Sequence, residues 1–116
     1  MIRQTGFDLE ERTAKFGEAV IKLVHGIKQN AINRPLNTQL VKCATSIGAN
    51  YCEANNAESR ADFKHKIGIC KKESRESIRF LRMMATAVPE IKEQASLLYK
   101  EARELNLIFA SISKKL

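Results

Sequence analysis

The sequence predicts an all-α protein, an antiparallel up-down-up-down four-helix bundle, on three observations. Apolar residues recur at alternating steps of three and four along four segments, the pattern of a helix that buries one stripe. The 116 residues include only two Pro and five Gly, which argues against a turn-rich all-β fold. The joints between the segments are short, and short joints favour antiparallel neighbours. The length fits one domain over residues 1–116 with a single core.

The first helix is expected over residues 8–30 and the second over residues 37–57. Asp8 and Glu11 have the spacing of a capping pair at the first helix start. Pro35 should prevent the first helix from continuing, and Asn37 is a suitable N-cap for the second. The first stripe consists of Leu9, Thr13, Phe16, Val20, Leu23 and Ile27. The second stripe consists of Leu40, Cys43, Ala44, Ile47, Tyr51 and Ala54.

The third helix is expected over residues 60–87 and the fourth over residues 89–115. Ser59 should cap the third helix, with Asp62 as its partner, and Pro89 suits the first turn of the fourth. The third stripe consists of Phe63, Ile67, Cys70, Ser74, Ser77, Leu81 and Met84. The fourth stripe consists of Ile91, Ala95, Leu98, Ala102, Leu105, Phe109, Ile112 and Leu116.

The positive charge of the chain is concentrated in the third helix. The formal net charge is +7 and the pI about 9.5. Residues 59–88 hold eight Lys or Arg and three acidic residues, an excess of +5. Such an excess indicates either a polyanionic partner or simple solubility.

Most of these cations fall on one flank of the third helix when residues are placed at steps of about 100°. We call this set the basic ribbon: Arg60, Lys64, Lys71, Lys72, Arg75, Arg79 and Arg82. It can be a solvated surface with internal pairs such as Glu76 with Arg79, or a face that contacts nucleic-acid phosphates. No aromatic residue interleaves the basic ribbon, so we expect backbone contact with weak sequence preference rather than base stacking.

Other residues outside the stripes suggest contacts between helices or between copies. Apolar residues off the stripes predict an oligomer interface or a broadened core: Ile69, Phe80, Met83, Leu97 and Ile108. Four polar residues on one line of the second helix predict a network between helices, or a ligand or subunit contact: Gln39, Ser46, Asn50 and Glu53. The small residues Gly48 and Ala49 could permit a close approach of another helix.

No reaction is predicted, and neither a cofactor nor a metal is expected. The only acid-x-x-His match is Asp62 with His65, away from the core sector and without a second copy. Cys43 and Cys70 should be buried apolar residues, and Cys52 has no evident base. No run of about 20 apolar residues and no secretory signal is found. Three cysteines without a C-x-x-C pair suit a reducing cytoplasm, so a cytoplasmic protein without a membrane partner is expected.

Residues 39–63, followed by Lys72 and Glu73, resemble the four-helix bundle proteins encoded within intervening sequences of bacterial 23S rRNA genes. The matching pieces include SIGANY at residues 46–51, EAN at residues 53–55 and ESRADF at residues 58–63. That family is similar to the accessory variability determinant of diversity-generating retroelements, a basic homopentamer that binds nucleic acid and a reverse transcriptase. The resemblance implies a pentameric ring. The chain departs from the family pattern at Arg79 and Arg82, where relatives more often carry aromatic or acidic residues.

The sequence therefore predicts a non-catalytic, basic, homo-oligomeric protein that contacts RNA or DNA backbone through the third helix. The alternative is a protein-interaction scaffold, for example a partner of a reverse transcriptase or of an rRNA-associated factor. A third interpretation is a self-assembling bundle that travels with a mobile element. The choice between RNA and DNA, and the identity of any protein partner, are left open by the residues.

Overall fold

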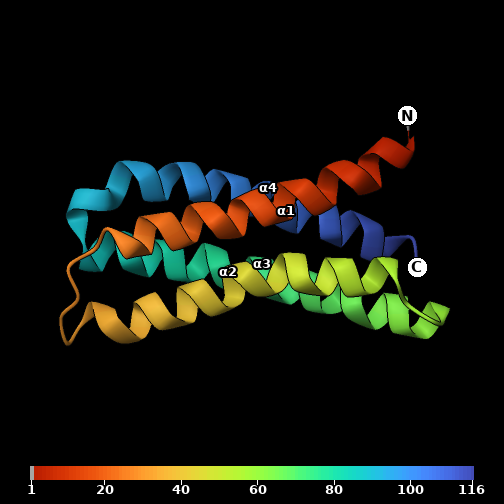
Figure 1. The fold of residues 1–116 in the computed structure, drawn as a ribbon, viewed down its shortest axis with the longest axis horizontal. Helices are drawn as coiled ribbons and strands as arrows, with labels where there is room; N and C mark the ends of the chain where they lie inside the picture. Colours follow the sequence, from red (N-terminus) through yellow and green to blue (C-terminus); the bar gives the residue numbers. More distant parts are fainter. Residues whose placement is uncertain (1) are drawn as a thin grey trace.

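The protein is an up-down bundle of four α-helices in a computed structural model that describes the backbone of residues 2–116 and the side chains of residues 9–116. Its elements in order are α1 (Ile2–His25), α2 (Asn33–Asn55), α3 (Arg60–Ala87), the short 3-10 helix η1 (Pro89–Ile91) and α4 (Lys92–Lys114). Successive helices run in opposite directions, so the start of α1 and the end of α4 lie at the same end of the bundle (Figure 1). The predicted all-α class and bundle topology are confirmed.

Each helix packs on its neighbours in sequence. The contacts of α3 with α2 and with α4 are the most extensive, those of α1 with α2 are fewer, and those of α1 with α4 are fewer again. In Figure 1, α1 and α2 lie in front of α4 and α3. Since α3 contacts both α2 and α4, it lies diagonally across the bundle from α1. This placement decides which helices can share a surface with α3.

The predicted stripes form the core. In the middle of the bundle they are buried almost without exception, including the polar residues Thr13, Ser74 and Ser77. Toward the ends of the helices the stripe residues are half-buried: Leu23, Phe63, Leu98, Ile112 and Leu116. Full burial of one large apolar side chain stabilises a fold by about 1.5–3 kcal/mol, so these stripes account for the packing of the four helices.

The ends of α1 and α2 differ from the sequence expectation. Helix α1 begins at Ile2, so the backbone is already helical at Asp8, whose side chain lies outside the described residues. It ends at His25, and α2 begins at Asn33, four residues before the expected cap Asn37. Pro35 lies in the first turn of α2, where a residue without an N–H is tolerated because that N–H has no intrahelical partner.

The joint between α1 and α2 is held by asparagine side chains. The Asn30 Oδ1 accepts hydrogen bonds from the backbone N–H of Ile32 at 2.9 Å and of Asn33 at 2.8 Å. The Asn33 Oδ1 in turn accepts from the Asn30 N–H at 3.0 Å, and its Nδ2 donates to the Lys28 carbonyl at 3.1 Å. These bonds satisfy donors at the start of α2, which explains why the helix begins before Asn37.

Helix α2 ends at Asn55 rather than at residue 57, and α4 begins at Lys92 rather than at residue 89, whereas the start of α3 agrees with its sequence signal. The Ser59 hydroxyl accepts a hydrogen bond from the Asp62 N–H at 3.0 Å, as expected of the cap of α3. Pro89 begins η1, which leads directly into α4. The small residue Gly48 lies where α1 and α2 approach closely: a Cβ placed there would be 3.2 Å from the Thr13 Oγ1.

Candidate nucleic-acid interface

Six of the seven residues of the basic ribbon lie on the side of α3 that faces α4. The Asn106 side chain of α4 donates hydrogen bonds to the Lys71 carbonyl at 2.9 Å and to the Ser74 Oγ at 3.0 Å, which places Lys71 on the α4 side. Arg82 lines a hollow between α3 and α4. The other members follow these two at helical spacings of three, four, seven or eleven residues: Arg60, Lys64, Arg75 and Arg79. All six are exposed except Lys71, which is half-buried.

Lys72 is placed differently from the rest of the basic ribbon. It is exposed and lines a hollow between α2 and α3, beside the carboxylate residues Glu73 and Glu76. The structure therefore brings together six of the seven predicted cations on the α4 side of α3. It places Lys72 beside the hollow between α2 and α3 instead.

No residue of the basic ribbon takes part in an ion pair within residues 9–116. The pair of Glu76 with Arg79 that the solvated-surface interpretation suggested is therefore not formed there. By contrast Lys66, the one α3 cation outside the basic ribbon, donates to the Glu53 Oε1 of α2 at 2.6 Å. The cations facing α4 thus have no carboxylate within pairing distance in this range, whereas the cation facing α2 is paired.

Helix α4 extends the positive flank, which the sequence interpretation missed. Lys92 and Tyr99 line the same hollow as Arg82. Arg103 is exposed and follows Tyr99 by four residues and precedes Asn106 by three, so it shares their α3-facing side. The helical period of α4 places Lys92, Tyr99 and Arg103 on one side of the helix. The sequence alone does not show that this side lies next to α3.

Two acidic residues of α4, Glu101 and Glu104, lie toward α1 instead. Arg12 of α1 forms a bidentate pair with Glu101, through Nε at 2.7 Å and Nη2 at 2.8 Å. The same Nη2 lies 2.6 Å from the Glu104 Oε1. These hydrogen bonds raise the pKa of the Arg12 guanidinium. Lys92 and Arg103 of α4 therefore lie on its α3 side, whereas Glu101 and Glu104 lie on its α1 side.

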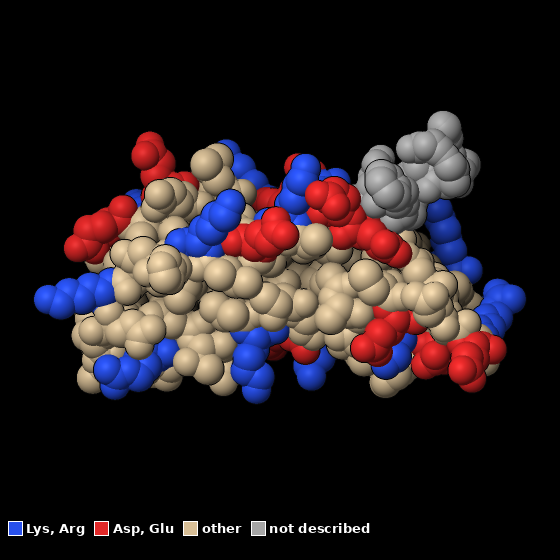
Figure 2. Space-filling model, in the orientation of Figure 1, with Lys and Arg blue, Asp and Glu red and all other residues tan. Residues whose placement is uncertain are grey.

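The front face of the bundle, formed by α1 and α2, has a different charge pattern. Figure 2 shows Lys and Arg interspersed with Asp and Glu around a broad uncharged band. A hollow along this face is lined mostly by small and apolar residues, among them Gly17, Ile21, Gly48 and Ala49. The excess of positive charge on the α3–α4 flank is therefore a local property.

The predicted interface residues fall on two different sides of the bundle. Phe80 lines the hollow between α2 and α3, whereas Leu97 lines a hollow between α1 and α4. Leu97 is 65% exposed and Met83 38% exposed. Ile69 is half-buried, and Phe80 and Ile108 are half-buried and pack on the core of their own bundle. Leu107, which also lies outside the fourth stripe of the sequence, is 65% exposed as well.

The four polar residues of α2 do not form one connected network. The Asn50 Nδ2 donates to the Ser46 carbonyl and to the Ser46 Oγ, both at 2.9 Å, within α2. Glu53 is joined to α3 through Lys66. Gln39 is exposed and borders the hollow between α2 and α3, with no side-chain bond to the other three within residues 9–116. The four polar residues are therefore not joined to one another, because Glu53 accepts a hydrogen bond from Lys66 of α3 whereas Asn50 and Ser46 bond to each other within α2.

Two of the three thiols lie in the core. Cys43 and Cys70 are buried, and Cys52 is exposed. Burial raises the pKa of the Cys70 thiol to about 12 and also raises the pKa of Cys43, so both are neutral at physiological pH. His65 is exposed, and residues 9–116 contain no group of three or more His, Cys, Asp or Glu placed to hold a metal ion.

These features define a small, basic, all-α bundle with one cationic flank. The family described as 23S rRNA-intervening sequence protein matches residues 7–111, and the chain belongs to that family. The resemblance seen in residues 39–63 is thereby confirmed. A crystal structure of a protein with unknown function from the S23 ribosomal protein family of Bacteroides thetaiotaomicron is similar, with a TM-score of 0.80 and 26% identity over 94% of this chain and 97% of that chain.

No curated protein matches the chain. Neither the family description nor that of the similar structure names a catalytic activity. Within residues 2–116, none of the helices is both long and apolar enough to cross a bilayer.

Proposed function

We propose that this protein is a non-catalytic nucleic-acid-binding protein that contacts RNA or DNA backbone through the basic ribbon. The observation that carries the proposal is the gathering of six cations on the α4 side of α3, none of them in an ion pair within residues 9–116. Lys92 and Arg103 of α4 extend this flank. Free cations in a row can each replace a condensed counterion on a phosphate backbone.

The expected binding is strongly dependent on salt. Each neutralised phosphate contributes about −0.9 to the slope of log K against log salt concentration for duplex DNA and about −0.7 for a single strand. Six contacts therefore predict a slope of about −5 for a duplex and about −4 for a single strand. Because the contacts are to the backbone, sequence preference should be weak.

Self-association would multiply this charge. We propose a cytoplasmic homo-oligomer, a pentamer by resemblance, in which five copies carry five times +7, a formal charge of +35. The placement of Leu97 and Phe80 on different sides of the bundle supports a ring, because a ring joins two unlike surfaces of each copy. Light scattering of the purified chain tests this; a monomer at all concentrations would contradict it.

The binding proposal is tested by reversing charge on and off the basic ribbon. The ribbon variant is Lys64→Glu, Arg75→Glu and Arg79→Glu. The control variant is Lys15→Glu, Lys22→Glu and Lys28→Glu, on α1 and the joint after it. Each variant takes the formal net charge from +7 to +1. Fluorescence anisotropy with labelled RNA and DNA should show a much larger affinity loss for the ribbon variant; equal losses would remove the basic ribbon from the mechanism.

The alternative function is a protein-interaction scaffold, such as a partner of a reverse transcriptase or of an rRNA-associated factor. The observation that favours it is the exposure of Leu97 and Leu107, both 65%, on α4. Nucleic-acid affinity equal to that of an unrelated protein with the same net charge would favour this alternative.

A further inference from the structure

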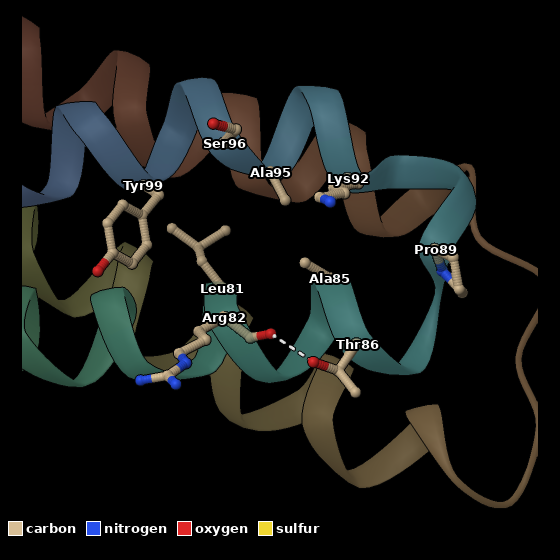
Figure 3. A pocket seen from close by; sticks show the side chains of 9 residues that line it. All are labelled: Leu81, Arg82, Ala85, Thr86, Pro89, Lys92, Ala95, Ser96 and Tyr99. Carbon is tan, nitrogen blue, oxygen red and sulfur yellow. Dashed lines mark hydrogen bonds between the residues drawn. The ribbon is translucent and has the colours of Figure 1, made fainter.

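A hollow of about 580 Å³ lies beside the basic ribbon, between the end of α3, η1 and the start of α4. Its volume is within the range of about 300–1,000 Å³ that is typical of sites for small molecules. Nine residues line it: Leu81, Arg82, Ala85, Thr86, Pro89, Lys92, Ala95, Ser96 and Tyr99 (Figure 3). The site is therefore large enough for one nucleotide, and it is continuous with the proposed phosphate-binding flank through Arg82.

The lining has an apolar floor and an aromatic wall. Leu81, Ala85 and Ala95 supply the floor. Tyr99 reaches from α4 toward Leu81, at the end of the hollow away from Pro89 (Figure 3). The Tyr99 side chain is half-buried and packs on the core, so its ring is held in place while part of it is accessible. A flat, apolar base face is the ligand surface that such a wall stacks against.

The charged groups of the hollow are both positive. Arg82 comes from α3 and Lys92 from α4, and no acidic residue is among the nine that line it. The Thr86 hydroxyl donates to the Arg82 carbonyl at 3.3 Å, which leaves the Thr86 oxygen available as an acceptor. Cations from two helices at one apolar hollow suit a ligand that has a flat apolar part and anionic groups on both sides of it.

We propose that this hollow holds one unstacked nucleotide of a single-stranded RNA or DNA segment, with its base against Tyr99 and its neighbouring phosphates near Arg82 and Lys92. The inference deepens the proposed function and rests on it. A base that is paired and stacked within a duplex cannot enter the hollow, whereas a base in a loop or free strand can. The protein therefore prefers unpaired segments. The expectation of no stacking considered α3 alone; the aromatic side chain comes from α4.

The emission of Tyr99 gives a direct measurement. The chain has no Trp and two Tyr, so in the Tyr51→Phe variant Tyr99 is the only Tyr, and excitation at a wavelength that Phe does not absorb isolates its emission. Tyr51 is buried against Phe109, with ring centroids 5.8 Å apart, and lies outside the hollow. The ligands are a short RNA strand, the DNA strand of the same sequence, the corresponding duplex, and adenosine monophosphate. Single strands should quench Tyr99 emission, and the duplex should bind without quenching it.

The variant Tyr99→Leu should reduce single-strand affinity about tenfold and change duplex affinity less than about twofold. Tyr99→Phe keeps the ring and should bind as the parent does. Ala85→Leu fills the hollow without changing Tyr99, so it gives a second test if Tyr99→Leu does not fold. Circular dichroism checks the fold of each variant.

The outcomes separate this inference from the proposed function. Absence of quenching together with unchanged single-strand affinity in Tyr99→Leu and Ala85→Leu would overturn the nucleotide site. If the Lys64, Arg75 and Arg79 variant still loses binding in that case, the proposed function stands. Quenching by adenosine monophosphate at concentrations as low as those of the strands would overturn the strand assignment in favour of a free nucleotide. A failure of every strand and duplex to bind would overturn both proposals.

Discussion

The α1–α4 side and the α3–α4 flank of this bundle both carry arginines, but these are paired with carboxylates on the first and unpaired on the second among residues 9–116. On the side where α4 meets α1, Arg12 is bound by Glu101 and Glu104. On the flank where α3 meets α4, the basic ribbon has cations of the same type with no carboxylate within pairing distance among residues 9–116. The comparison shows that a count of charges along the chain does not decide their role. The partners that the fold supplies decide it.

The packing at the α1–α2 contact also differs from that on the outside of α3. Helices α1 and α2 meet closely at Gly48, where an added Cβ would lie 3.2 Å from the Thr13 Oγ1. On α3, by contrast, a Cβ added at the exposed Gly68 would have nothing within 4 Å. A side chain at Gly48 would therefore force Thr13 to shift, whereas Gly68 faces open space on the outside of the cationic helix.

The largest expected effect on stability is at the α1–α2 contact. The substitution Gly48→Leu must push α1 away or displace Thr13, so we expect the free energy of unfolding to fall by about 1–3 kcal/mol. Urea denaturation followed by circular dichroism measures it. An unchanged midpoint would show that α1 and α2 are not as closely packed as the structure has them.

A second expected effect concerns the buried side of α3. The pKa of Cys70 is raised to about 12, whereas a thiol in the unfolded chain titrates near about 8.5. A raised native pKa stabilises the fold fully at low pH, and this stabilisation is lost as pH rises from about 8.5 toward about 12. We expect the free energy of unfolding to fall by about 1–2 kcal/mol between about pH 8 and about pH 10.

The control for this pH dependence is Cys70→Ala, which removes the thiol at the cost of some packing. Its stability should decline less over the same pH range. A decline as steep as that of the parent would assign the effect to other groups, among them Cys43, whose pKa is also raised by burial.

A smaller effect distinguishes paired from unpaired arginines. Arg12→Gln should lower the free energy of unfolding by about 1 kcal/mol, because it breaks a bidentate pair at the partly exposed α1–α4 contact. Arg75→Gln, on the basic ribbon, should change it by less than about 0.5 kcal/mol. Nucleic-acid affinity should respond in the reverse order, falling for Arg75→Gln and staying near the parent value for Arg12→Gln. Equal responses of both variants in either assay would contradict the contrast between the two sides.

The smallest effect is at Gly68. Gly68→Ala replaces a flexible residue in the middle of α3 by a strong helix former with no clash, so stability should rise by about 0.5–1 kcal/mol. Thermal denaturation measures the change. A loss of stability would mean that this part of α3 is covered in the protein as it exists in solution, for example by another copy.

Much of the fold followed from one property of the sequence, the spacing of apolar residues. The stripes predicted the core, because burial in a bundle repeats with the helical period. The beginning of α2 did not follow, because it depends on how the Asn30 and Asn33 side chains bond across the joint. Pro35 is tolerated within α2 because the helix begins at Asn33, which places Pro35 in the first turn. Local polar bonds of this kind leave little trace in periodicity.

The candidate site was predictable only as far as one helix could describe it. The basic ribbon is a property of α3 alone, so its period was sufficient to find it. The contributions of Lys92, Tyr99 and Arg103 required knowledge of which flank of α4 meets α3. The division of the polar line on α2 likewise depended on Lys66 reaching Glu53 from another helix. Contacts between helices set these roles, and the sequence of a single helix does not contain them.

The salt dependence of binding tests the central claim most directly. For a single strand, the parent protein should show a slope of log K against log salt concentration of about −4, and the variant with Lys64, Arg75 and Arg79 reversed a slope at least about 2 shallower. The control reversed at Lys15, Lys22 and Lys28 should keep the parent slope. The same slope in all three proteins, or a slope near zero in the parent, would contradict the assignment of phosphate contacts to the α3–α4 flank.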